Sequence, residues 1–126
     1  WEAPTQPGRF DFAALVDDAA LATTLSALAT RLVPVFATDF ERLSWHINVP
    51  DGAIEVALDR GAILARRYGR EASTPICELE LELKSGNERA LQTLAAQLQA
   101  LVDLTPANES KAARGYALFH SLAGAA

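Results

Sequence analysis

The sequence predicts an α+β fold, in which one antiparallel sheet is flanked by three helices. Two observations lead to this prediction. Apolar residues recur at helical spacing up to residue 32 and again from residue 88, whereas the fifty residues between alternate apolar and polar side chains. Short turn sequences, such as "PDG" at 50–52, divide the alternating region and are typical of neighbouring strands joined in a meander.

The N-terminal segment is expected to hold a lead-in and one helix. Residues 1–17 contain two prolines and a glycine, so we expect an irregular lead-in. Residues 18–32 form the first predicted helix, because Leu21, Leu25, Leu28 and Leu32 recur at helical spacing. An aspartate at 17 or 18 is placed to cap its N-terminus.

Residues 33–84 are predicted to form the antiparallel strands. Alternation over 35–49, 53–58, 62–68 and 76–84 indicates four strands. The sequence "DRG" at 59–61 reads as a second tight turn, and 69–75 as a loop. Cys77 falls in the last strand, where we expect it to be buried.

Two more helices are predicted over 87–122. Asn87 is placed to cap a helix over 88–103, and Pro106 ends that unit. Asn108 is placed to cap the last helix, whose apolar side is expected to include Ala112, Tyr116, Phe119 and Leu122. The tail at 123–126 resembles a linker.

Composition limits the classes of protein to which this chain can belong. Its 126 residues suffice for one domain, and half of them are hydrophobic, which excludes a disordered chain. The net charge of −5 argues against a general nucleic-acid binder, and no apolar run approaches a membrane span. We therefore expect neither nucleic-acid nor membrane partners. The lone Cys77 cannot form an internal disulfide, so we expect a cytoplasmic protein.

The first residue is also informative. The chain begins at Trp1 and contains no methionine, so we expect it to be a processed or truncated piece of a longer protein.

The sequence "ICELELELKSG" at 76–86 places three carboxylates on one face of a strand and three leucines on the other. The polar face of the predicted sheet then collects Arg42, His46, Glu55, Asp59, Glu78, Glu80 and Glu82. Two interpretations are open. This face is either the solvated outside of a half-buried sheet, or a polar lumen whose carboxylates bind Mg²⁺ or Mn²⁺ and whose basic residues hold phosphates.

Two cations of the last predicted helix admit the same two interpretations. Lys111 and Arg114 lie near its start, where the helix dipole disfavours positive charge. They are either solvated surface groups or contacts for a phosphate, because helix N-termini also attract anions.

Four sequences in order, "VFATDFER", "IEVALDRG", "PICELELELKSG" and "SKAARGYAL", resemble the C-terminal half of a CYTH domain. This family comprises the triphosphate tunnel metalloenzymes, and the resemblance is to the bacterial inorganic triphosphatase branch. It covers residues 33–122. The resemblance implies that the antiparallel meander is part of a triphosphate-tunnel β-barrel. It also implies that the missing N-terminal half of the same domain is a partner of this chain.

The resemblance further assigns roles to individual residues. Glu78 and Glu80 match the acidic pair of the metal-binding strand, Glu82 extends that row, and Asp59 matches an acidic tunnel position. Arg42 and Lys111 match basic positions that contact the triphosphate. Arg114 is a further candidate for substrate binding, as is Glu55, which stands where relatives often carry a base.

The function implied is metal-dependent hydrolysis of inorganic triphosphate or a related triphosphate by the parent domain, with this chain alone inactive. One alternative is cyclisation of ATP, as in class IV adenylate cyclases. Another is a module that binds polyphosphate or nucleoside triphosphate without turnover, and a third is an interaction domain with a solvated acidic face. In the bacterial branch a helical phosphate-binding domain often follows, and we expect that this chain precedes one.

Overall fold

The structure is a computed structural model, and it describes residues 1–124. The chain divides into two compact units, Trp1–Pro34 and Val35–Ala126. The predicted linker at 123–126 lies partly outside the described residues. No helix within residues 1–124 is long and apolar enough to cross a membrane.

The first unit contains two helices, α1 (Phe12–Leu15) and α2 (Ala19–Ala29). Asp18 caps α2 as predicted, because its side chain accepts a hydrogen bond from the Leu21 amide at 2.9 Å. The helix ends at Ala29, three residues before the predicted end. The short α1 lies in the segment expected to be irregular, and Asp11 caps it. The α+β class is confirmed, and residues 1–124 contain four helices instead of the three predicted.

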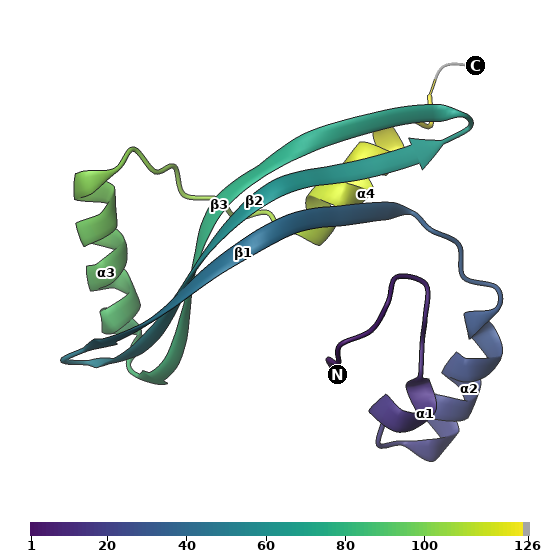
Figure 1. Cartoon of the computed structure of the whole chain (residues 1–126), viewed down its shortest axis with the longest axis horizontal. Coiled ribbons are helices and arrows are strands. Elements are labelled where there is room, and N and C mark those ends of the chain that lie inside the picture. Colours follow the sequence, from purple (N-terminus) through teal and green to yellow (C-terminus); the bar gives the residue numbers. More distant parts are fainter. Residues whose placement is uncertain (125–126) are drawn as a thin grey trace. The chain divides into compact units, whose positions relative to one another are not determined.

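The second unit is built on three antiparallel strands in the order β1 (Phe36–Val49), β2 (Gly52–Arg67) and β3 (Arg70–Gly86) (Figure 1). The prediction of a turn at 59–61 was wrong, because β2 runs through it as one strand. Any side chain at Gly61 would collide with the backbone of Asp39 and Phe40, so this glycine permits a close approach of two strands. Likewise β3 includes residues 70–75 of the predicted loop at 69–75.

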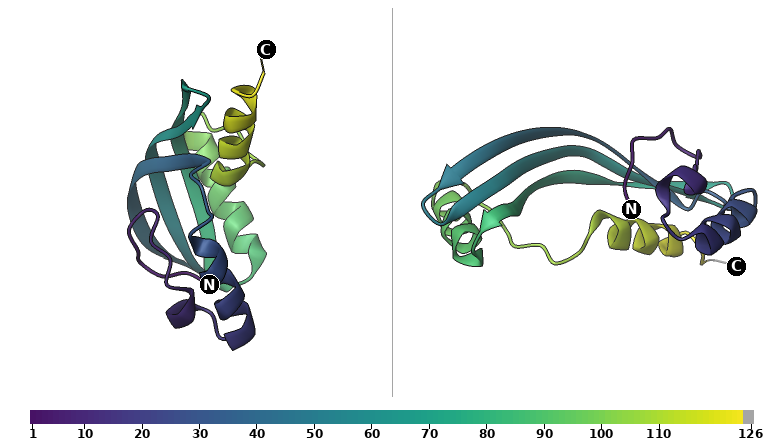
Figure 2. Two further views of the ribbon diagram at one scale, coloured as in Figure 1. Left: turned by 90° about the vertical axis from the view of Figure 1, so that its right-hand side faces the viewer. Right: turned by 90° about the horizontal axis from the view of Figure 1, so that it is seen from below.

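The turn between β2 and β3 lies at Tyr68 and Gly69 instead. Both residues have positive φ angles, of 50° and 72°. Two successive positive φ values are the requirement of a two-residue type I′ hairpin, whose twist matches that of the flanking strands. Strands β2 and β3 are therefore longer than the predicted strands, whereas β1 begins one residue after its predicted start and ends where predicted. All three strands curve along their length (Figure 2).

The two faces of the sheet are covered at opposite ends. Helix α3 (Glu88–Leu101) covers one face, where Ile54 and Val56 pack against Ala90 and Leu94. Helix α4 (Lys111–Ser121) lies at the other end of the strands (Figure 1). It contacts the opposite face of the sheet. Lys111 of α4 forms an ion pair with Asp59, and Gly115 packs against Phe36. By strand alternation and register, Asp59 and Phe36 point away from the face that α3 covers. Asn87 caps α3, as predicted.

The start and the orientation of α4 differ from the prediction. Ser110, not Asn108, is the N-cap, since its Oγ accepts a hydrogen bond from the Ala113 amide at 3.0 Å. Any side chain at Gly115 would collide with the Phe36 ring, so the helix approaches the sheet through this glycine. The helix face that meets the sheet consequently carries Lys111, Arg114, Gly115 and Leu122, whereas Ala112 and Tyr116 are exposed.

Cys77 is exposed, contrary to the prediction. It lies opposite Arg60 on the face that carries α3, in the half of the strands where α3 no longer packs. An alternation rule predicts the face of a strand residue but not whether a helix covers that part of it.

Candidate metal and phosphate site

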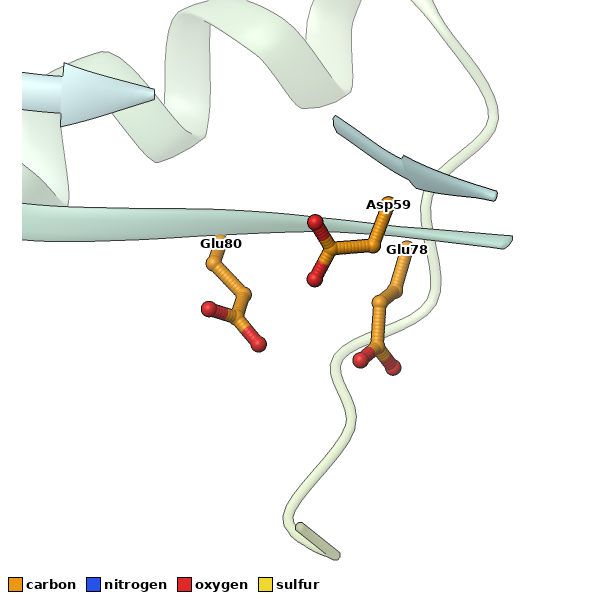
Figure 3. A group of neighbouring side chains, drawn as sticks. All are labelled: Asp59, Glu78 and Glu80. Atoms are coloured by element: carbon orange, nitrogen blue, oxygen red, sulfur yellow. The ribbon is translucent and has the colours of Figure 1, made fainter. Parts of the chain in front are cut away.

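The strand register brings the predicted site residues of three strands into one row. Arg42 of β1 lies directly opposite Asp59 of β2, which in turn lies opposite Glu78 of β3. Glu80 follows two residues further along β3, on the same face. Figure 3 shows the carboxylates of Asp59, Glu78 and Glu80 projecting from the same side of the two strands.

Asp59 is the most buried charged residue of the cluster, with a side chain that is 0% exposed. Arg42 holds it with two parallel bonds, from Nε to Oδ1 at 2.6 Å and from Nη2 to Oδ2 at 2.7 Å. These bonds, together with the hydrogen bond and charge of Lys111, outweigh the burial of Asp59 and lower its pKa from 3.8 to about 2. The same pairing raises the pKa of Arg42. Both groups are therefore charged at neutral pH.

Lys111, the first residue of α4, lies among the three carboxylates. Its Nζ is 2.6 Å from Asp59 Oδ2, 2.5 Å from Glu78 Oε1 and 2.6 Å from Glu80 Oε1. Burial by itself lowers the pKa of Lys111, but the surrounding carboxylates outweigh it and raise that pKa overall. Lys111 is thus an ammonium enclosed by acidic oxygens, with a side chain only 13% exposed.

Arg114 and Phe40 complete the surroundings of the cluster. Arg114 donates a hydrogen bond from Nη1 to Glu78 Oε2 at 3.3 Å. Its Nε and Nη2 atoms are buried and find no acceptor among the described residues. The Phe40 ring lies 4.9 Å from Lys111 Nζ and 5.7 Å from the Arg42 guanidinium carbon, which places an aromatic face beside two cations.

A second acidic row on the same face stays separate. Glu55 lies opposite Glu82 in the strand register. The Glu82 carboxylate pairs with Lys84 at 3.1 Å, and Glu55 lies 3.6 Å from His46 Nε2. Neither carboxylate contacts Lys111, Arg42 or Arg114 among the ion pairs of the described residues.

The three-carboxylate set of Asp59, Glu78 and Glu80 fits a hard divalent cation. One oxygen of each residue lies within 4.8 Å of the other two. Carboxylate oxygens are the donors that Mg²⁺ and Mn²⁺ prefer, and the set contains no nitrogen or sulfur ligand. A shallow cavity of about 340 Å³ opens beside it, lined among others by Glu78, Glu80, Ser110 and Lys111.

Six of the eight predicted site residues meet in this cluster: Arg42, Asp59, Glu78, Glu80, Lys111 and Arg114. Glu55 and Glu82 lie outside it, and their roles in binding stay predictions. The structure groups Asp59, rather than Glu82, with the Glu78–Glu80 pair. Reading 52–67 as one strand would have placed Asp59 opposite Glu78. Phe40 was not predicted, although it precedes Arg42 by two residues on the same strand face.

Comparison with known proteins matches the chain to a family model and to a curated relative. The family model described as CYTH domain matches residues 1–116. An inorganic triphosphatase of Haemophilus influenzae is 41% identical over 90 residues, which are 71% of this chain and 24% of that protein. The chain therefore spans about a quarter of the length of this relative. No solved structure matches the chain.

Proposed function

The chain belongs to the CYTH domain family, and on that premise we propose that the complete protein hydrolyses inorganic triphosphate, or a closely related triphosphate, with a divalent cation. This chain supplies the three-carboxylate set and the basic groups around it. The name of the Haemophilus relative favours inorganic triphosphate over ATP cyclisation as the reaction.

One observation carries this proposal. Three carboxylates and three cations, drawn from three strands and one helix, converge on one face of the sheet. Exposed ion pairs stabilise a fold by at most about 1 kcal/mol each. The stability of a solvated outer face therefore does not require six charged groups to converge. A triphosphate chain needs both kinds of group, since it is bound as a complex of anionic oxygens with a divalent cation.

The residues divide by chemistry. Asp59, Glu78 and Glu80 would hold Mg²⁺ or Mn²⁺, which, when bound, polarises a phosphoryl oxygen. Arg42 and Arg114 present planar guanidinium groups suited to phosphate oxygens, and Lys111 offers a mobile point charge. Together these cations offset the charge of the phosphates and orient the triphosphate for in-line attack by water.

Arg114 gives independent support for an anionic ligand. Two of its nitrogens are buried without an acceptor among the described residues. Buried donors of this kind are rare in proteins, and leaving a charged one unsatisfied costs about 1–3 kcal/mol or more. A phosphate oxygen in the adjoining space would satisfy them.

The test is phosphate release from inorganic triphosphate by the complete protein at limiting Mg²⁺. We expect Glu78→Gln and Glu80→Gln to lower the rate by about 100-fold or more, because each removes charge from the metal set. Glu71→Gln is the control, since it changes an exposed carboxylate of the same strand that pairs with Arg66 outside the cluster, and it should retain the rate within about 3-fold. Circular dichroism checks that each variant is folded.

Three results would contradict the proposal. Wild-type rates in both Glu78→Gln and Glu80→Gln would remove the metal assignment. Tight triphosphate binding without phosphate release would make the protein a binding module. Conversion of ATP to a cyclic nucleotide, without release of phosphate from inorganic triphosphate, would assign it to the cyclases.

A further inference from the structure

We propose that Lys111 is a tethered cation that occupies the three-carboxylate set until a divalent ion replaces its ammonium, and that this exchange releases Lys111 to the phosphate. The inference rests on the proposed function and deepens it, because it concerns the order in which the same site takes its ligands. Its basis is the position of one nitrogen atom.

Lys111 Nζ and a bound metal ion would need the same space. The ammonium lies 2.5–2.6 Å from one oxygen of each of Asp59, Glu78 and Glu80. The same three residues form the proposed metal set, in which one oxygen of each lies within 4.8 Å of the other two. Mg²⁺ binds oxygen at about 2.0–2.1 Å, so an ion on these oxygens and the ammonium would be nearly in contact. Their repulsion excludes joint occupancy.

The charge of the cluster explains why the exchange links two ligands. Three carboxylates face three cations, Arg42, Lys111 and Arg114, so the formal charge is zero. A divalent ion in place of the ammonium gives the site one excess positive charge, and the displaced lysine beside it adds a second. A triphosphate, which is strongly anionic, is attracted to that state and not to the neutral one. Each ligand therefore raises the affinity of the other.

The side-chain chemistry singles out Lys111 as the group that moves. The Arg42 guanidinium is fixed by two parallel bonds to the buried Asp59 carboxylate. Lys111 carries a compact charge on a flexible four-carbon chain that can reorient. It also lies in the first turn of α4, where the helix dipole disfavours a cation. Once the carboxylates are taken by a metal ion, nothing in α4 retains the ammonium.

The first test measures Mn²⁺ affinity by calorimetry in phosphate-free buffer, with the complete protein. We expect Lys111→Met to bind Mn²⁺ at least about 10-fold more tightly than wild type, because the competing cation is gone. Lys84→Met is the matched control. It also removes a lysine paired with a glutamate of β3, but outside the three-carboxylate set, and should stay within about 2-fold.

The outcomes separate the two proposals. Equal or weaker Mn²⁺ binding by a folded Lys111→Met protein overturns the tethered-cation inference and leaves the proposed function standing. Absence of Mn²⁺ binding in both wild type and variant overturns the proposed function, and the inference with it.

A second measurement needs no variant. The ¹⁵Nζ resonance of Lys111 in the wild-type protein should show a protected ammonium without metal, and should move toward the position of a solvated lysine at saturating Mg²⁺. Triphosphate added afterwards should shift it again. A resonance that Mg²⁺ leaves unchanged, in a protein that calorimetry shows to bind Mg²⁺, would overturn the inference even if Lys111→Met fails to fold.

Discussion

Glu78 and Glu80 differ from Glu82, although all three lie on the same face of the same strand. Their side chains are 19%, 48% and 66% exposed. The first two share Lys111 and bond to Arg114 and Arg42, respectively, whereas the third pairs only with Lys84, two residues away. The alternating sequence is the same throughout, and α4 covers only part of this face. Where the site is formed, cations from α4 and β1 offset the repulsion between the carboxylates of the strand. At Glu82, solvent and the neighbouring Lys84 do so.

We call the part of this sheet face around Asp59, Glu78 and Glu80 the inner region, and the part around Glu82 and Lys84 the outer region. The largest expected effect comes from neutralising the buried anion of the inner region. Asp59→Asn should lower the free energy of unfolding by about 3 kcal/mol, because Arg42 and Lys111 lose a buried, hydrogen-bonded partner. Urea denaturation of the complete protein measures this. Asp39→Asn, an exposed change on β1, is the control and should cost under about 0.5 kcal/mol. A similar small loss for both variants would show that Asp59 is not a structural anchor.

Acid should destabilise the protein through the buried Asp59 carboxylate. The pKa of Asp59 is lowered from 3.8 to about 2 in the folded chain. Its contribution to stability is therefore fully present above pH 4 and is lost as the pH falls toward 2. The shift corresponds to about 2 kcal/mol. Urea midpoints at pH 5, 4, 3 and 2 should fall more steeply for wild type than for Asp59→Asn. Parallel curves would contradict this origin of the acid sensitivity.

Much of the difference between the two regions is absent from the sequence pattern. Alternation correctly placed Arg42, Asp59 and Glu78 on one face, because side-chain direction in a strand depends only on parity. It did not reveal that 59–61 continues a strand, since "DRG" has turn composition and only the close approach of Phe40 explains Gly61. The resemblance to CYTH domains supplied the proposed roles of Lys111 and Asp59, which local periodicity alone could not.

The orientation of α4 illustrates the same limit. An apolar side through Ala112 and Tyr116 was predicted from hydrophobicity, but the helix meets the sheet through Gly115 and two cations. A residue without a side chain contributes nothing to a hydrophobic pattern, yet here it determines which face can approach Phe36. The burial of Lys111 and Arg114 follows from that tertiary contact.

A smaller effect sharpens the comparison through the start of α4. Ser110→Ala removes the N-cap hydroxyl that accepts a hydrogen bond from the Ala113 amide, and should destabilise the protein by about 1 kcal/mol. Because the cap precedes Lys111, the ammonium should also become more mobile, with a broader ¹⁵Nζ resonance. Ser121→Ala, at the other end of the helix, is the control for stability and should leave that resonance unchanged. Equal broadening in both variants would show that the Ser110 cap does not restrict the motion of the Lys111 ammonium.

The smallest effect is expected in the outer region. Glu82→Gln removes one member of an exposed pair with Lys84 and should change the free energy of unfolding by less than about 0.5 kcal/mol. The same urea experiment measures it. A loss comparable to that of Asp59→Asn would mean that the two regions form one network rather than two.

The central strand β2 has a consequence for how the second unit unfolds. Ile54 and Val56 belong to the core under α3, whereas Ile63 and Ala65 are buried on the face that α4 contacts. Neither core can form without β2 paired on both sides, so the two are expected to be lost together in one cooperative transition. Backbone amides in the middle of β2 should then share a single slow hydrogen-exchange rate, set by global opening, and exchange last in the chain.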